Sequence, residues 1–122
     1  MGDFFGKGSA LKDYSEVFVT VADKYQIDYR LMPAMAMQET TGGRDGVEEQ
    51  HNPFNFRGHE GKLYKFASWE EGIEALGKEL KEGYIDQGLV TPYQIMTKYT
   101  PKSLLDGGSW AMKIERYMKT IK

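Results

Sequence analysis

The stretch "AMAMQETTGG", residues 34–43, joins an apolar run to a pair of glycines and carries a single carboxylate, Glu39. Its alanines and methionines favour a buried helix, and Gly42 or Gly43 is free to take the left-handed conformation that commonly ends one. Proline fits only the first turn of a helix. Either residues 28–32 form a loose single turn, or the regular helix begins at Pro33. Both interpretations place Glu39 near the C-terminal end of the helix.

Glu39 therefore has two interpretations. The negative end of a helix dipole disfavours a charged carboxylate, and an apolar wall beside it would raise the pKa further by desolvation. A carboxyl that stays protonated at neutral pH is what a general acid needs to cleave a glycosidic bond. The bland alternative is a helix-end glutamate in full solvent, which is common on protein surfaces.

Helical signals continue on both sides of this stretch. Residues 10–25 carry apolar side chains at helical spacing. Further along the chain, capping boxes begin at Ser68 and Thr91, and the second has proline at its first helical position. The helix after Thr91 should end before Pro101, and a last helix should begin near Ser109. The pattern therefore predicts about five helices.

One segment between the second and third predicted helices has a different composition. The runs "FNF" (54–56) and "LYKF" (63–66) are typical of strands, and the intervening "RGHEGK" (57–62) is typical of a turn. We therefore predict a short β-hairpin. The expected fold class is α+β and predominantly α-helical, in a single domain over residues 1–122 that could also form part of a longer protein.

The composition excludes several classes of function. Sixteen basic and eighteen acidic residues give a net charge of -2, whereas a duplex-binding domain usually shows a strong basic excess. The chain has no cysteine, and His51 and His59 lack the spacing and the third ligand of a zinc site. No window approaches the roughly 18 apolar residues of a membrane helix. We expect no nucleic-acid partner, metal, cofactor or membrane insertion.

Four motifs, in order along residues 10–121, resemble the glucosaminidase family of bacterial autolysins and phage tail lysins. This family belongs to the lysozyme-like superfamily and is related to the lytic transglycosylases. "AMAMQETTGGRDG" is similar to "A-x-x-x-E-[ST]-x-x-G", and "NPFNFRG" (52–58) is similar to "N-[LP]-F-G-I-K". "FASWEEGIEAL" is similar to "Y-x-S-x-x-E-A/G-I", and "YTPKSLLDGGSWAMKIERYM" is similar to "Y-A-T-D-P-x-Y-A-x-K-I". The chain departs from the family at Asn55, Arg57 and Trp110, where the family has Gly, Lys and Tyr.

The resemblance implies a lysozyme-like fold and an enzyme that cuts β-1,4 glycosidic bonds in the glycan strands of peptidoglycan. In that family the glutamate matching Glu39 is the catalytic acid. Sugar binding needs flat apolar faces together with amide or hydroxyl groups. The candidate substrate-binding residues are Asn52, Asn55, Phe56, Tyr64, Tyr99 and Trp110. Tyr99 and Trp110 are also good core candidates, and we expect Phe54 to point inside.

The second carboxylate remains open. Inverting glycosidases place their two carboxyls roughly 6.5 to 9.5 Å apart, and double-displacement retaining enzymes about 5 to 5.5 Å. Glu60 is the nearest equivalent by position and our second catalytic candidate, with Asp45, Glu48 and Glu49 as rivals. None of the four carries a distinguishing motif.

Three alternatives to a hydrolase with a second catalytic carboxylate follow. Lytic transglycosylases use one glutamate as acid and then base, so that the muramic acid 6-hydroxyl attacks and an anhydro product forms. Substrate-assisted cleavage through the N-acetyl group also dispenses with a protein nucleophile. A catalytically silent glycan-binding or assembly module is the rival from another class. In each case we expect a monomeric domain acting outside the cell, in the cell wall or on a virion.

Overall fold

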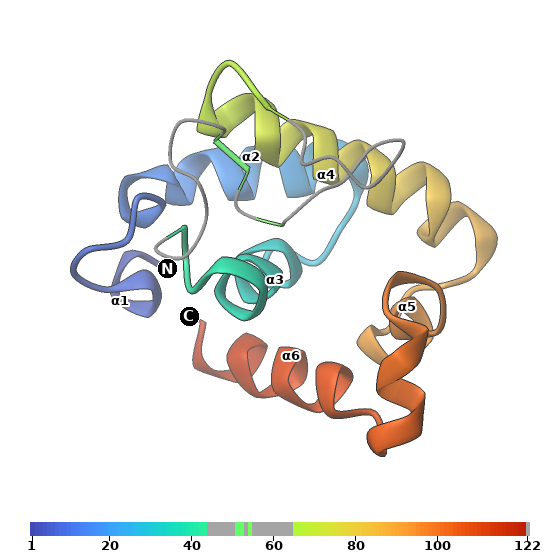
Figure 1. The fold of residues 1–122 in the computed structure, drawn as a ribbon. Coiled ribbons are helices and arrows are strands. Elements are labelled where there is room, and N and C mark those ends of the chain that lie inside the picture. Colours follow the sequence, from blue (N-terminus) through green and yellow to red (C-terminus); the bar gives the residue numbers. More distant parts are fainter. Residues whose placement is uncertain (44–50, 53, 55–64, 122) are drawn as a thin grey trace.

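The computed structural model describes residues 1–43, 51–52, 54 and 65–121. Helices surround a central helix, and both chain ends lie on the same side of the molecule (Figure 1). The α-helices are α1 (Gly2–Phe5), α2 (Ser15–Tyr25), α3 (Leu31–Thr40), α4 (Trp69–Gly83), α5 (Pro92–Tyr99) and α6 (Ser109–Thr120). Short 3₁₀ helices join them at η1 (Lys12–Tyr14), η4 (Ile85–Gln87) and η5 (Pro101–Asp106). No helix in the described part of the chain is long and apolar enough to cross a membrane.

The predicted α+β class is wrong, because the described residues contain helices and turns but no strand. At the predicted hairpin, Phe54 lies in a turn, and Lys65 and Phe66 are irregular. The rest of that segment, residues 55–64, lies outside the described residues. Strand propensity mainly measures how well a side chain fits a half-buried surface, and the Phe54 ring finds such burial among helices. A lone two-stranded hairpin would also be only marginally stable.

The helices predicted from capping signals are confirmed. At the start of α5, the Thr91 hydroxyl accepts the Gln94 N–H at 3.2 Å, and the Gln94 side chain accepts the Thr91 N–H at 3.1 Å. Ser68 accepts the Glu71 N–H at the start of α4. The first predicted helix differs, because residues 12–14 are 3₁₀ and the regular helix begins only at Ser15.

The central helix α3 is buried over most of its length. Residues 31–36 are all buried, and α2, α4 and α6 pack around it. A helix that is apolar on every side is stable only inside a protein, which explains its position. It begins two residues before Pro33, so the proline lies in the first turn, where its missing N–H is not needed.

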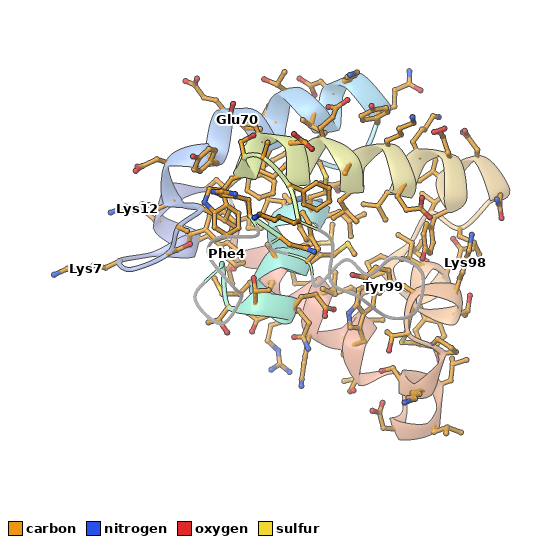
Figure 2. The ribbon with its side chains drawn as sticks, turned by 45° about the horizontal axis from the view of Figure 1, so that its top comes forward. Phe4, Lys7, Lys12, Glu70, Lys98 and Tyr99 are labelled. Atoms are coloured by element: carbon orange, nitrogen blue, oxygen red, sulfur yellow. The ribbon has the colours of Figure 1, made fainter. Side chains whose placement is uncertain are left out.

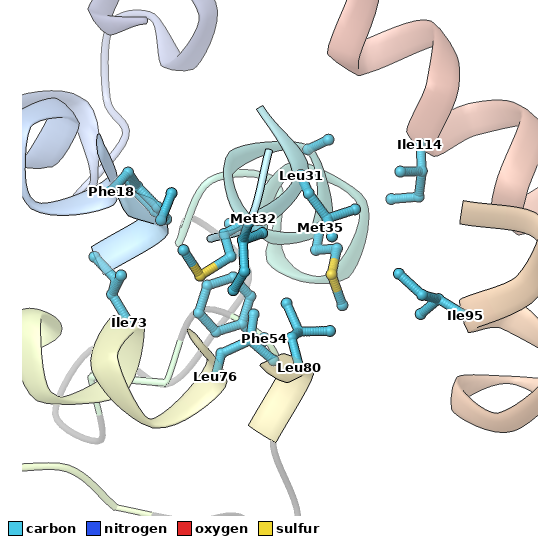
Figure 3. Close-up of a cluster of buried hydrophobic side chains, with 14 of the residues drawn as sticks. Phe18, Leu31, Met32, Met35, Phe54, Ile73, Leu76, Leu80, Ile95 and Ile114 are labelled. Atoms are coloured by element: carbon cyan, nitrogen blue, oxygen red, sulfur yellow. The ribbon is translucent and has the colours of Figure 1, made fainter. Parts of the chain in front are cut away.

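The core lies between α3 and the surrounding helices (Figure 3). Met32 and Met35 from α3 lie near Leu76 and Leu80 from α4, and Phe54 lies among these side chains. The prediction that Phe54 points inside is confirmed, since its side chain is 1% exposed. The burial of α3 brings its last turn, with Glu39, close to the start of α6.

Candidate active site

The C-terminal end of α3 is held by its own side chains and backbone. The buried Thr40 hydroxyl donates to the Ala36 carbonyl at 3.1 Å and accepts the Gly43 N–H at 2.9 Å. Thr41, Gly42 and Gly43 all have left-handed φ angles, of 52°, 70° and 89°. We predicted a left-handed conformation at Gly42 or Gly43; both glycines take it, and so does Thr41, which is the C-cap of the helix. The helix therefore ends abruptly, one residue after Glu39.

Glu39 lies on the last turn of α3, with its carboxyl partly withdrawn from solvent. The indole N–H of Trp110 donates to Glu39 Oε1 at 3.1 Å. Burial raises the pKa of Glu39 above its ordinary value, and the hydrogen bond from Trp110 opposes this shift without reversing it. The negative end of the α3 dipole acts in the same direction as burial. The site therefore favours the protonated acid more than bulk water does.

Two aromatic residues from α5 and α6 lie beside Glu39. Tyr99 ends α5, and its ring lies 5.3 Å from the Trp110 ring, with 31° between the planes. Figure 2 labels Tyr99 where α5 approaches α6. Burial raises the pKa of Tyr99, and the nearby charges of Glu39 and Tyr84 add to the effect. The phenol therefore stays neutral, and its hydroxyl donates to the Phe54 carbonyl at 3.4 Å.

Side chains from η5 anchor the start of α6. The Ser103 hydroxyl accepts the Trp110 backbone N–H at 2.9 Å, and Asp106 accepts the Ser109 backbone N–H at 3.0 Å. These two residues serve a helix whose N-cap, Gly108, has no side chain to offer. Ser103 and Asp106 were not among the predicted site residues, although their positions seven and four residues before Trp110 are visible in "SLLDGGSW".

The remaining predicted site residues divide into two groups. Asn52 is buried, and its side-chain oxygen accepts the Phe54 N–H at 3.4 Å. This contact holds the backbone at Phe54. Outside the described residues lie Asn55, Phe56, Glu60 and Tyr64, together with the rival carboxylates Asp45, Glu48 and Glu49. Of the predicted site, the structure thus brings Glu39, Tyr99 and Trp110 together.

His51 has a structural contact in the described part of the chain. Its Nδ1 lies 3.1 Å from the Phe66 carbonyl oxygen, and its ring packs edge-on against Trp69 at 5.3 Å. Among residues 1–43, 51–52, 54 and 65–121, no three histidine, aspartate or glutamate side chains lie together in a way that could hold a metal ion.

No protein-family model matches the chain, and a search of curated proteins found no match. The function therefore has to be inferred from the residues and their geometry.

Proposed function

We propose that the chain cleaves β-1,4 glycosidic bonds of peptidoglycan glycan strands, with Glu39 as the general acid. The observation that carries this proposal is the environment of the Glu39 carboxyl. The carboxyl is partly withdrawn from water, its pKa is raised, and one oxygen accepts a hydrogen bond from the Trp110 indole N–H. The resemblance to the glucosaminidase family supports the same assignment, because the matching glutamate of that family is the catalytic acid.

Trp110 is a suitable neighbour for a general acid because its indole N–H is an uncharged hydrogen-bond donor. A lysine or arginine in its place would stabilise the carboxylate strongly and pull the pKa down. The indole N–H orients the carboxyl and still leaves burial as the larger influence on the pKa. Protonated Glu39 then donates its proton to the leaving glycosidic oxygen as the bond breaks. The same N–H stabilises the carboxylate that remains.

The rest of the proposed site comes from Tyr99 and from the resemblance. Tyr99 offers a ring next to the acid, and Asn52, Asn55, Phe56 and Tyr64 are the substrate-binding residues that the family match implies. Glu60 remains the proposed second carboxylate for a hydrolytic, endo-β-N-acetylglucosaminidase-like reaction. We propose that the domain acts on cell walls from outside the cell or as part of a virion.

Digestion of purified sacculi, followed by mass spectrometry of the products, tests the proposal. We expect the parent protein to release soluble muropeptides with new reducing ends. Glu39→Gln keeps the shape of the side chain but removes the acid, so we expect about a 10²- to 10⁴-fold loss of rate. Glu115→Gln is the matched control, because Glu115 is an exposed carboxylate on α6.

The products also discriminate among the alternatives. Anhydro-muropeptides without new reducing ends would replace hydrolysis by transglycosylation and keep Glu39 as the acid. Binding of the parent protein to sacculi without release of fragments would contradict an enzymatic function and favour a glycan-binding module. A Glu39→Gln protein that digests sacculi at the parent rate would refute the assigned role of Glu39.

A further inference from the structure

The Trp110 side chain is almost completely buried. It is 5% exposed, one side of its ring packs on Tyr99, and its N–H donates to Glu39. So little of the ring is exposed that Trp110 has hardly any face to offer a sugar. Its direct effect on the site is therefore to orient the Glu39 carboxyl, and this orientation depends on how the first turn of α6 is held.

The first turn of any helix has backbone N–H groups without a partner inside the helix. The N-cap of α6 is Gly108, which has no side chain, and Ser103 in η5 accepts an N–H of the first turn instead. The Ser103 hydroxyl accepts the Trp110 N–H at 2.9 Å, and the Ser103 carbonyl accepts the Gly108 N–H at 2.8 Å. Ser103 thus accepts hydrogen bonds from two backbone N–H groups at the start of α6, those of Gly108 and Trp110.

The Ser103 hydroxyl has two further polar neighbours, since Ser109 Oγ lies 3.3 Å from its oxygen and Asp106 offers a carboxylate. Asp106 Oδ1 lies 3.2 Å from Ser103 Oγ and accepts its hydrogen. Once this proton points at the carboxylate, a lone pair of the serine oxygen is free for the Trp110 N–H. Ser103 is itself only 6% exposed, so loss of the hydroxyl would leave a buried N–H without its acceptor.

We propose that Ser103 is a positioning residue for Glu39, because it fixes the start of α6 so that the Trp110 indole N–H meets the carboxyl. The consequence for catalysis rests on the proposed function, whereas the effect on the Glu39 carboxyl does not. The other side-chain helix caps, Ser68 and Thr91, accept the N–H three residues ahead in exposed positions. Ser103 instead holds the residue that donates to Glu39.

NMR titration tests the proposal without any assay of activity. The probes are the Glu39 side-chain carboxyl carbon and the Trp110 indole N–H, assigned with Glu39→Gln and Trp110→Phe. In Ser103→Ala we expect the indole signal to leave its hydrogen-bonded position and Glu39 to titrate at a higher pH than in the parent. Ser103→Thr, which keeps a hydroxyl, should restore parental behaviour. The matched control Ser68→Ala removes a capping hydroxyl at another helix and should leave both signals unchanged.

A second variant covers the case in which Ser103→Ala does not fold. Asp106→Ala removes the acceptor of the Ser103 proton from an exposed position, so the fold should persist. We expect a shift of the Glu39 titration in the same direction as in Ser103→Ala. Parental titration of Glu39 and a parental indole signal in a folded Ser103→Ala or Asp106→Ala protein would overturn the proposal.

An activity measurement links positioning to catalysis. The rate falls on the alkaline side as Glu39 loses its proton, so Ser103→Ala should move that limb of the kcat/KM profile to higher pH. We expect kcat to fall by about tenfold, less than the roughly hundredfold loss that a 1 Å misplacement can cause. A parent protein without wall-cleaving activity would contradict the proposed function, and the NMR titration would still decide the role of Ser103.

Discussion

Glu39 and Glu74 both accept a hydrogen bond from an aromatic side chain, but their pKa values are shifted in opposite directions. The donor is the Trp110 indole for Glu39 and the Tyr25 hydroxyl for Glu74. Glu74 lies between α4 and α2, is 38% exposed at its side chain, and also pairs with the Lys24 ammonium. The hydrogen bonds from Lys24 and then Tyr25 lower the pKa of Glu74, whereas burial raises that of Glu39.

The comparison shows that an aromatic donor alone does not decide the protonation state. A cation beside an exposed carboxylate favours the charged form, as Lys24 does for Glu74, and burial favours the neutral form, as it does for Glu39. Glu39, whose pKa is raised by burial, lies in the last turn of α3. Glu74, whose pKa is lowered, links α4 to α2 through its hydrogen bonds with Lys24 and Tyr25.

Truncating the donor at the buried site should have the largest effect. We expect Trp110→Ala to lower the free energy of unfolding by about 3–5 kcal/mol, because the indole is almost completely buried. Urea unfolding gives this value. Trp110→Phe is the control that keeps a ring and removes the N–H, and its loss should be clearly smaller. Equal losses in the two variants would mean that packing of the ring contributes little.

Separating α2 from α4 should have an intermediate effect and disturb the Glu74 site. A Cβ atom at Gly77 would lie 2.5 Å from Val21 Cγ1, a position that both side chains cannot share. We expect Gly77→Ala to cost about 1–3 kcal/mol in urea unfolding. The pKa of Glu74 should rise toward its ordinary value as Tyr25 moves away.

The matched control for this variant is Gly83→Ala on the same helix. There the added Cβ meets the flexible end of the Glu79 side chain, which can move aside. Loss of stability in Gly83→Ala as large as in Gly77→Ala would contradict a role for the close approach of α2 and α4.

The pH dependence of stability should show the smallest effect, with opposite signs at the two sites. The folded pKa of Glu39 is raised above its ordinary 4.5, so its stabilising contribution is complete at low pH and is lost as the pH rises through the folded value. Glu39→Gln should therefore gain stability relative to the parent as the pH rises. The lowered pKa of Glu74 gives a contribution that is present above 4.5 and lost as the pH falls.

Urea unfolding over a series of pH values measures both differences. Glu74→Gln should be less stable than the parent at neutral pH, and this deficit should shrink in acid. Exposed Glu115→Gln serves as the control for the substitution itself. The contrast between the two sites would be refuted if the stability difference from the parent changed with pH in the same direction for Glu39→Gln and Glu74→Gln.

Local signals predicted much of the helical architecture. The Thr91 capping box, the stop before Pro101 and the start of the last helix at Ser109 all depend on residues within a few positions of each other. The hairpin prediction failed for the same reason. "FNF" has a strand-like composition, but what Phe54 packs against is decided by distant helices. Local composition cannot distinguish burial in a sheet from burial among helices.

The candidate site shows where local information ends. The sequence by itself placed Glu39 near the end of an apolar helix and predicted a left-handed glycine after it, at Gly42 or Gly43. Only the tertiary structure brought Trp110, 71 residues away, to the Glu39 carboxyl and placed Ser103 behind it. Most helix ends are set by hydrogen bonds between residues close in the sequence, whereas the protonation of a carboxyl depends on everything that packs around it.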